Sequence, residues 1–273
     1  MHTTVDVGSA RLYVEQHGSG PDLVMLHGRG HSSAAVWDGV VPALARHFRV
    51  TIYDQRGHFR SAAGDGASDQ SVARHADDLR LLKDALGIER CHLLGFSFGG
   101  LVVQEFALAH PERVQSLILA CTTCGVKPHL FADYLDRADL IEREGLAAFA
   151  EKTIARVLSP AFMAAHPDRV ATYRRDFLAD NAKSYAAAMR AIVAWNACER
   201  IGALKCPVLV LGGAEDDTPM SAMQAGAAAR ELQRLIPGAQ LQLIPGVRHY
   251  IQMETPENFV AALESFFAGA SKR

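Results

Sequence analysis

The sequence has no long apolar run and no cluster of basic residues. None of its apolar stretches approaches the roughly 20 residues that a membrane-spanning helix needs. Its 28 Lys and Arg residues nearly balance its 30 Asp and Glu residues, which gives a net charge of −2. We therefore expect no nucleic acid and no membrane as partner. Residues 1–6 lack the basic and apolar regions of a signal peptide, so we expect a cytoplasmic location.

Cysteine is scarce, with five residues in 273. An odd number in a chain of this size predicts free, mostly buried thiols in a reducing compartment. Cys121 and Cys124 have C-x-x-C spacing, but a zinc ion would need a second pair of ligands at suitable spacing, and the sequence has none. We therefore predict no metal site and interpret these two residues as small residues at the end of a strand.

Apolar strand-like runs alternate with helix-like segments along most of the chain. The predicted strands are 3–7, 11–15, 22–26, 49–53, 91–94, 114–120, 208–211 and 240–244, and the predicted helices are 36–47, 71–86, 101–110, 221–236 and 256–268. This alternation predicts an α/β fold with a mostly parallel central sheet flanked by helices. It stops between residues 125 and 202, which are mostly helical. We predict a core made of residues 1–124 and 203–273, with residues 125–202 as an inserted helical cap.

The motif Gly95-Phe96-Ser97-Phe98-Gly99 lies between a predicted strand and a predicted helix. In that context G-x-S-x-G places the serine on a sharp turn with its hydroxyl exposed. Glycine accepts the strained backbone of such a turn and allows close backbone approach. The alternative is that Ser97 serves only as the N-cap of the helix. A helix cap rarely needs glycine on both sides, however. The motif therefore predicts Ser97 as a nucleophile.

A serine nucleophile needs a base, and that base needs an acid to orient it. His249 follows the predicted strand 240–244, and Asp216 follows the predicted strand 208–211. The carboxyl ends of parallel strands share one edge of the sheet, where such folds bind ligands. The sequence therefore predicts that Ser97, Asp216 and His249 meet at this edge, with Glu215 and Asp217 as alternatives for the acid.

Five motifs occur in the order found in the α/β-hydrolase family, namely Leu26-His27-Gly28-Arg29, Asp54-Gln55-Arg56-Gly57-His58, the Ser97 turn, Gly213-Ala214-Glu215-Asp216 and Gly246-Val247-Arg248-His249. On these motifs the chain resembles that family over essentially its full length. The resemblance implies Ser97 as nucleophile, His249 as general base and then acid, and Asp216 as its orienter. It also implies an oxyanion hole formed by the backbone N–H groups of Arg29 and Phe98.

The activity that this resemblance implies is hydrolysis of a carboxylic ester or small lactone through an acyl-enzyme, with a small molecule as substrate and no cofactor. The same fold also hosts carbon–carbon bond hydrolases of ring-cleavage products, lyases, cofactor-free oxygenases and hormone-type receptors, and an intact triad does not separate these classes. Within the cap, residues 159–196 resemble β-ketoadipate enol-lactonases, which usually lack a pair such as His27-Gly28.

The predicted substrate contacts are His27, Gly28, Phe162, Arg190 and Trp195. Phe162 and Trp195 either line the pocket or pack the cap helices on the core. An arginine that points into the pocket would favour an anionic substrate, and Arg29 and Arg190 are the candidates. Phe59 replaces a glycine of the family, so its loop takes a different turn or places Phe59 in the pocket. The sequence is compatible with a homo-oligomer and does not determine the oligomeric state.

Overall fold

The computed structural model describes residues 2–62, 69–218 and 224–270. An eight-stranded sheet forms its centre, and the strands are β1 (His2–Asp6), β2 (Arg11–His17), β3 (Asp22–Leu26), β4 (Arg49–Tyr53), β5 (Cys91–Phe96), β6 (Val114–Ala120), β7 (Val208–Gly213) and β8 (Gln240–Ile244). Their order in the sheet is β1-β2-β4-β3-β5-β6-β7-β8. Only β2 runs antiparallel to its neighbours, β1 and β4, and all other pairs are parallel. The predicted α/β fold with a mostly parallel sheet is confirmed.

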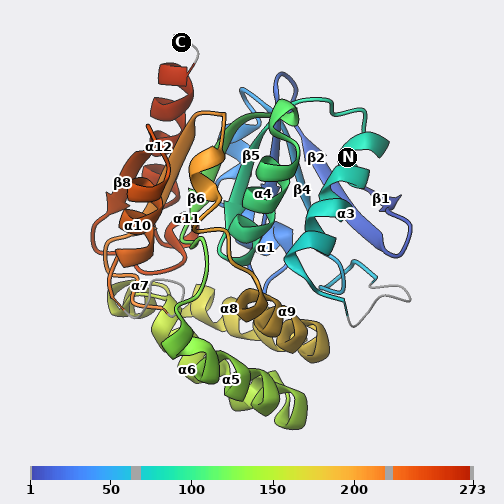
Figure 1. Cartoon of the computed structure of the whole chain (residues 1–273). Coiled ribbons are helices and arrows are strands. Elements are labelled where there is room, and N and C mark those ends of the chain that lie inside the picture. The colour runs from blue at the N-terminus through green and yellow to red at the C-terminus, as the bar shows by residue number, and fades with distance from the viewer. Residues whose placement is uncertain (1, 63–68, 219–223, 271–273) are drawn as a thin grey trace.

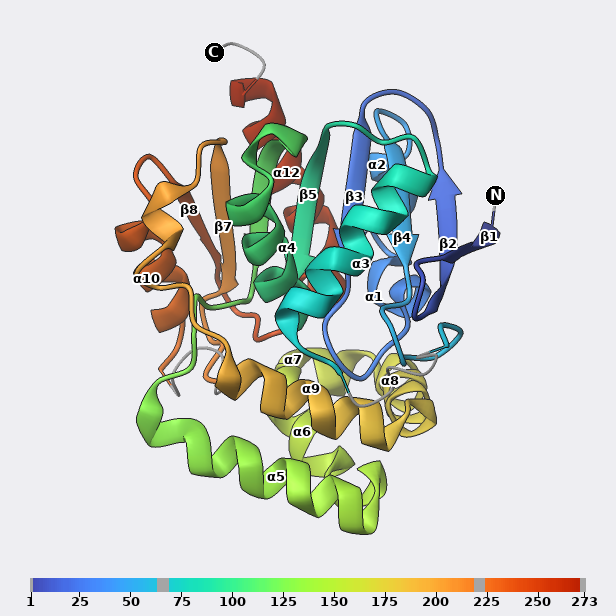
Figure 2. The same cartoon turned by 45° about the vertical axis from the view of Figure 1, so that its right-hand side comes forward.

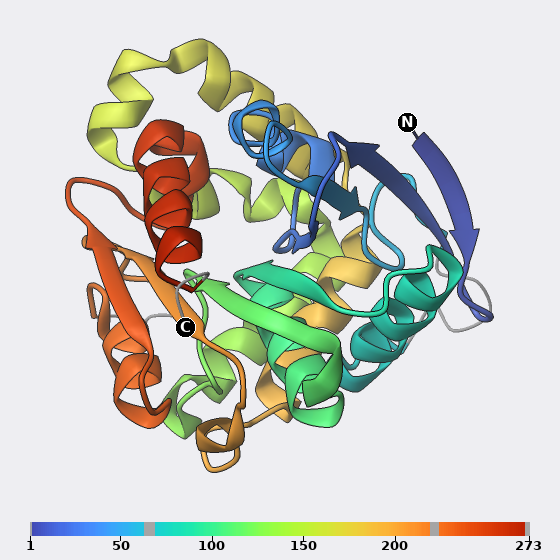
Figure 3. The same cartoon turned by 90° about the horizontal axis from the view of Figure 1, so that it is seen from above.

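Helices cover both faces of this sheet, so its central strands are buried on both sides, as parallel strands require. In Figure 2, α3 and α4 lie in front of the sheet, and α1, α2 and α12 lie behind it. Figure 3 shows that the sheet twists between β1 and β8. The core helices are α1 (Ser33–Trp37), α2 (Val41–Leu44), α3 (Val72–Ala85), α4 (Phe98–Ala109), α10 (Ala227–Leu235), α11 (Ile251–Glu254) and α12 (Pro256–Ala270).

Five further helices lie below the sheet in Figures 1 and 2, at the carboxyl ends of the parallel strands. We call them the cap helices: α5 (Phe131–Glu144), α6 (Ala150–Val157), α7 (Pro160–Ala165), α8 (Pro167–Ala179) and α9 (Ala182–Ala194). All five fall within the helical segment predicted from the sequence. In the described parts of the chain, no helix has the length and apolar character needed to cross a bilayer.

Three predicted helices differ from the observed ones. The helix predicted at 221–236 begins only at Ala227, because the chain turns at Gly226, where φ is 66°. Residues 36–47 form the two short helices α1 and α2, because Pro42 favours the first turn of a new helix after Gly39. The helix predicted at 101–110 already begins at Phe98, so the chain passes directly from the serine turn into α4. Residues 219–223, at the start of the helix predicted at 221–236, lie outside the described residues.

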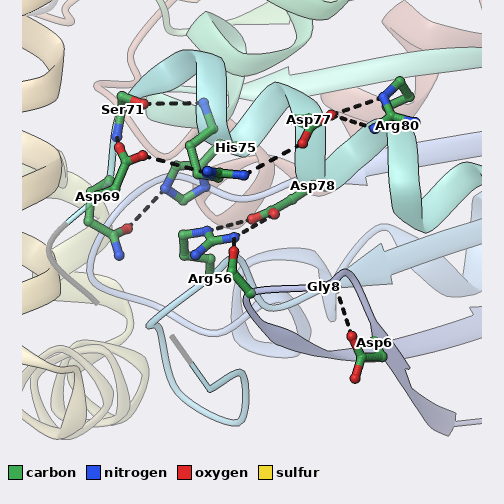
Figure 4. A network of polar contacts seen from close by, with 12 residues as sticks. Asp6, Gly8, Arg56, Asp69, Ser71, His75, Asp77, Asp78 and Arg80 are labelled. Carbon is green, nitrogen blue, oxygen red and sulfur yellow. Dashed lines mark hydrogen bonds and ion pairs between the residues drawn. The ribbon is translucent and has the colours of Figure 1, made fainter. Parts of the chain in front are cut away.

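A buried ion pair fixes the loop that follows β4. The guanidinium of Arg56 donates from Nε and Nη2 to both carboxylate oxygens of Asp78 on α3, at 2.7 and 2.6 Å. Figure 4 shows Arg56 and Asp78 facing each other. The guanidinium also donates to Ser9 Oγ at 3.0 Å. Both charged side chains are excluded from solvent, so neither can be removed without leaving an unpaired buried charge. The pair therefore ties this loop to α3 and to the β1–β2 turn.

The prediction that all cysteines are free thiols is wrong for two of them. Cys124 and Cys198 form a disulfide, whereas Cys91, Cys121 and Cys206 are free. Cys124 precedes the first cap helix and Cys198 follows the last, and the two chain segments run side by side. Gly125 pairs with Asn196 in an antiparallel bridge, and Ala197 N–H donates to Cys124 O at 2.7 Å. The disulfide therefore joins the entry and exit of the cap.

Reduction of this disulfide should lower the free energy of unfolding. The closed loop spans 74 positions, for which loop-closure entropy corresponds to about 4 kcal/mol. Urea unfolding of the wild type with and without dithiothreitol, beside Cys124→Ser, measures this loss. Cys206→Ser is the matched control, because its thiol is free and its stability should still respond to the reductant. A titration that finds five thiols in the unreduced, denatured protein, instead of three, contradicts the prediction.

Candidate active site

Ser97 occupies a strained turn between β5 and α4. Its backbone has φ 53° and ψ −116°, in a region that residues with a side chain rarely adopt. The glycines of the motif make the turn possible. A Cβ at Gly95 would lie 2.6 Å from Gly100 Cα, and one at Gly99 would lie 2.6 Å from His27 O. Small residues are therefore required on both sides of the serine, as the motif predicts.

The structure brings the three predicted triad side chains together. His249 Nε2 lies 3.0 Å from Ser97 Oγ, and His249 Nδ1 lies 2.8 Å from Asp216 Oδ2. Asp216 is 1% exposed, whereas its neighbours Glu215 and Asp217 are exposed. Of the three candidate acids, only Asp216 contacts His249.

Electrostatics keeps Asp216 ionised despite its burial. Burial alone would raise the pKa of this carboxyl group, but the charge and hydrogen bond of His249 and the hydrogen bonds of Thr218 outweigh it. One of these is the Thr218 N–H, which donates to Asp216 Oδ1 at 3.0 Å. The pKa of Asp216 therefore lies below its ordinary value, and the ionised carboxylate can accept a hydrogen bond from Nδ1–H of His249.

The loop that carries His249 is attached to the cap. His249 N–H donates to Val157 O at the end of α6, at 3.0 Å. Ser159 N–H, also in the cap, donates to Glu254 Oε2 on α11 at 3.1 Å. Movement of α6 relative to the core would therefore displace the imidazole.

Two backbone N–H groups lie beside Ser97 and donate no hydrogen bond within the described residues, those of Arg29 and Phe98. Phe98 is the first residue of α4, whose N-terminus carries a partial positive charge. Gly28 brings the Arg29 backbone close, because a Cβ at Gly28 would lie 2.9 Å from Ser97 Cβ. This geometry suits the stabilisation of an oxyanion formed at Ser97.

His27 holds the Gly28–Arg29 loop in place and does not line the cavity above Ser97. Its Nδ1–H donates to Gly28 O, and its Nε2 accepts from Gln55 N–H at 2.9 Å. Burial lowers the pKa of His27 to about 4, so the ring is neutral at pH 7 and can make both contacts. Gly28 is placed next to Ser97, as described above.

A cavity that is open to solvent at its mouth lies between Ser97 and the cap helices. Its walls include six aromatic side chains: Tyr134, Phe149, Tyr173, Phe177, Tyr185 and Tyr250. Four cationic side chains also line the cavity: Arg29, Arg137, Lys152 and Arg156. The cavity can therefore hold a small organic molecule with its reacting group at Ser97 Oγ.

None of the five residues predicted to contact substrate lines this cavity, and the three that lie in the cap form other contacts. Arg190 donates to Asp139 and Glu142 on the cap surface, both at 2.7 Å. The Trp195 indole donates to Glu105 at 2.9 Å, and the Phe162 ring packs 4.9 Å from that of His166. Of the two arginines considered for an anion, Arg29 alone lines the cavity.

Phe59 adopts a left-handed backbone with φ 48°, which is the conformation a glycine would take there. Phe59 is not among the residues that line the cavity. The loop therefore keeps a glycine-like turn, and the phenylalanine stays outside the site.

The sequence analysis missed the cationic and aromatic residues of the cap that line the cavity. Lys152 and Arg156 on α6 are four positions apart, so they share one face of the helix. That spacing predicts two cations on one face of a helix. The sequence near α6 does not show which face of the helix meets the cavity.

One group of metal-type ligands occurs in the described part of the chain: Cys121, Asp216 and His249 offer atoms within 4.8 Å of one another. A metal ion bound through His249 Nδ1 would break the hydrogen bond from that nitrogen to Asp216. Metal binding here and the hydrogen-bonded arrangement of the three side chains therefore exclude each other.

Comparisons with known proteins identify the family of this chain and proteins of similar fold. A family model described as alpha/beta hydrolase fold matches residues 21–256. A Caulobacter sp. (strain K31) protein named as a carbamate hydrolase, RutD, is 30% identical and covers 94% of this chain and 96% of its own length. The enol-lactonase from Burkholderia xenovorans LB400 has a TM-score of 0.88 and 26% identity, covering 97% of this chain and 100% of its own. A thermophilic esterase from Thermogutta terrifontis, malate bound, has a TM-score of 0.89 and 27% identity, covering 99% of each chain.

Proposed function

Because this chain belongs to the alpha/beta hydrolase fold family, we propose that it hydrolyses carboxylic esters or small lactones with Ser97 as the nucleophile. One observation carries the proposal: two hydrogen bonds link Ser97 Oγ through the His249 ring to Asp216, at 3.0 and 2.8 Å. An esterase and an enol-lactonase are among the solved structures with similar folds, which supports this substrate class.

In the first half of the reaction, Ser97 Oγ attacks the carbonyl carbon and His249 Nε2 accepts its proton. The carbonyl oxygen becomes an oxyanion, which the N–H groups of Arg29 and Phe98 stabilise by roughly 3–4 kcal/mol each. The carbon–oxygen bond to the leaving group then breaks, and His249 gives its proton to the leaving oxygen. An ester releases an alcohol, whereas the alcohol of a lactone stays attached to the acyl group.

In the second half, a water molecule attacks the acyl-enzyme and gives a proton to His249. The tetrahedral intermediate collapses, the proton returns to Ser97, and the carboxylic acid leaves. Asp216 remains ionised throughout and holds Nδ1–H of His249, so that Nε2 faces Ser97. In this proposal residues 125–202 act as a cap that limits the access of water and shapes the substrate site.

Carbamate hydrolysis is a second candidate, favoured by the 30% identical relative that is named as a carbamate hydrolase. The same nucleophile would attack the carbamate carbonyl, and His249 would protonate the leaving nitrogen. The Ser97 site would then need to accept a nitrogen leaving group, which a comparison of substrates can test.

A panel of aryl esters, small lactones, carbamates and vinylogous diketones, monitored for product release, tests the proposed function. We expect ester or lactone cleavage with a kcat/KM of at least about 10⁴ M⁻¹ s⁻¹ for the preferred substrate. Cleavage of diketones alone would indicate a carbon–carbon bond hydrolase, and of carbamates alone the second candidate. Tight ligand binding without turnover would indicate a receptor.

A further inference from the structure

The cavity above Ser97 has a one-sided charge. Arg29 comes from the loop after β3, Arg137 from α5, and Lys152 and Arg156 from α6. Among the described residues that line the cavity, no side chain is acidic. The chain as a whole carries a net charge of −2, so overall composition does not explain this concentration of positive charge.

Arg29 has buried donors without a partner. Its Nε and Nη1 are shielded from solvent and make no hydrogen bond to the described residues, and its guanidinium lies 4.9 Å from the centre of the Tyr185 ring. Buried polar groups in native proteins are almost always hydrogen-bonded, and a guanidinium binds carboxylates with particular strength. The Arg29 guanidinium therefore has donors free to bind an acceptor group that enters the cavity.

The cations of α6 line the cavity without forming an ion pair to the described residues, although Lys152 is exposed and Arg156 is half-buried. Burial and the nearby Arg137 charge lower the pKa of Arg156, and they outweigh the opposite effect of Asp133 and Asp217. Arginines elsewhere on the cap are paired: Arg174 bonds Glu151, and Arg190 bonds Asp139 and Glu142. Among the four cations that line the cavity, Arg137 has an acidic partner, Asp133. Three of the four cations therefore line the cavity without forming an ion pair to the described residues.

We propose that the preferred substrate carries a carboxylate, which Arg29, Lys152 and Arg156 bind while the reacting carbonyl lies at Ser97. This inference rests on the proposed hydrolytic function and adds its substrate class. Aromatic side chains, among them Tyr173 and Phe177, line the same cavity, so we expect the segment that joins the carboxylate to the reacting carbonyl to be apolar. A singly charged carboxylate suits this largely aromatic site better than a doubly charged phosphate, which costs more to desolvate.

The test compares 4-nitrophenyl half-esters of linear dicarboxylic acids with the neutral 4-nitrophenyl esters of monoacids of equal chain length. For at least one chain length, the wild type should prefer the anionic ester by about tenfold or more in kcat/KM. This preference should shrink as the salt concentration rises, because salt screens the charges at the open mouth of the cavity. Phosphonate analogues, tested as competitive inhibitors, should bind more weakly than carboxylates.

Variants then identify the residues that cause the preference for anionic over neutral esters. Arg29→Gln and Arg156→Gln should each lower the ratio of anionic to neutral kcat/KM by about tenfold, and Arg29→Lys should retain part of it. Arg190→Gln is the matched control, because its guanidinium bonds acidic residues on the cap surface, and its ratio should equal that of the wild type. The ratio is measured on one preparation of each variant, so a partly unfolded sample does not distort it.

The outcomes separate the two proposals. If the wild type cleaves neutral esters at least as well as anionic ones at every chain length, the carboxylate site is refuted and the hydrolytic function stands. If no ester is cleaved, the hydrolytic function fails. Calorimetry with adipate and Ser97→Ala then decides on the site: binding that weakens about tenfold in Ser97→Ala/Arg156→Gln supports it, and no binding to Ser97→Ala overturns it.

Discussion

Replacing Ser97 by alanine should lower kcat for ester hydrolysis about a million-fold, as the loss of a triad nucleophile does in other serine hydrolases. Alanine keeps the Cβ and therefore the same backbone constraint at φ 53°, and it removes only the oxygen that lies 3.0 Å from His249 Nε2. The fold should be preserved, so the loss reports on chemistry. Steady-state hydrolysis of an aryl ester by both proteins measures it.

Two further measurements test whether Ser97 is the nucleophile. A fluorophosphonate should modify the peptide that contains Ser97 in the wild type and leave Ser97→Ala unmodified, as mass spectrometry would show. The double variant Ser97→Ala/His249→Ala should be no slower than the single variant within about tenfold, because triad members act as a unit. Ser265→Ala, on the exposed side of α12, is the control for handling and should keep the wild-type rate. Wild-type turnover by purified Ser97→Ala would refute the mechanism.

The fold was largely predictable, because the strands are short runs that are either apolar throughout or alternate between apolar and polar residues, as in 240–244. The predicted bounds of 22–26, 49–53 and 240–244 coincide with β3, β4 and β8. The proximity of Ser97, Asp216 and His249 was equally predictable, because parallel strands bring the residues after their carboxyl ends to one edge of the sheet. Both inferences depend only on local pattern and on the order of elements along the chain.

The features that escaped prediction depend on contacts between distant segments. The disulfide exists because the chain leaves and re-enters the core through adjacent segments, and no local signal connects Cys124 with a residue 74 positions away. Arg156 and Arg190 both lie on cap helices, and only the packing of those helices decides that the first lines the cavity and the second pairs with Asp139. Substrate contacts were therefore less predictable than the triad.

Replacing Asp216 by asparagine should lower kcat about 10⁴-fold, although the geometry of the site would be retained. Thr218 N–H donates to Oδ1 of Asp216, and the amide oxygen of asparagine can accept the same bond. The amide NH₂ group would then face His249 Nδ1 and turn that nitrogen into an acceptor. Nε2 would carry the ring proton, so it could no longer accept the proton of Ser97.

The neighbouring acids provide matched controls for this prediction. Glu215→Gln and Asp217→Asn remove the same charge one position away, on exposed side chains that make no hydrogen bond to His249. Both should keep kcat within about threefold of the wild type, because screened surface charges contribute little. Measured kcat values for the three variants decide the assignment. A loss at Asp217→Asn that exceeds the loss at Asp216→Asn would transfer the orienting role to Asp217, whereas equal small losses would mean that His249 works without a carboxylate partner.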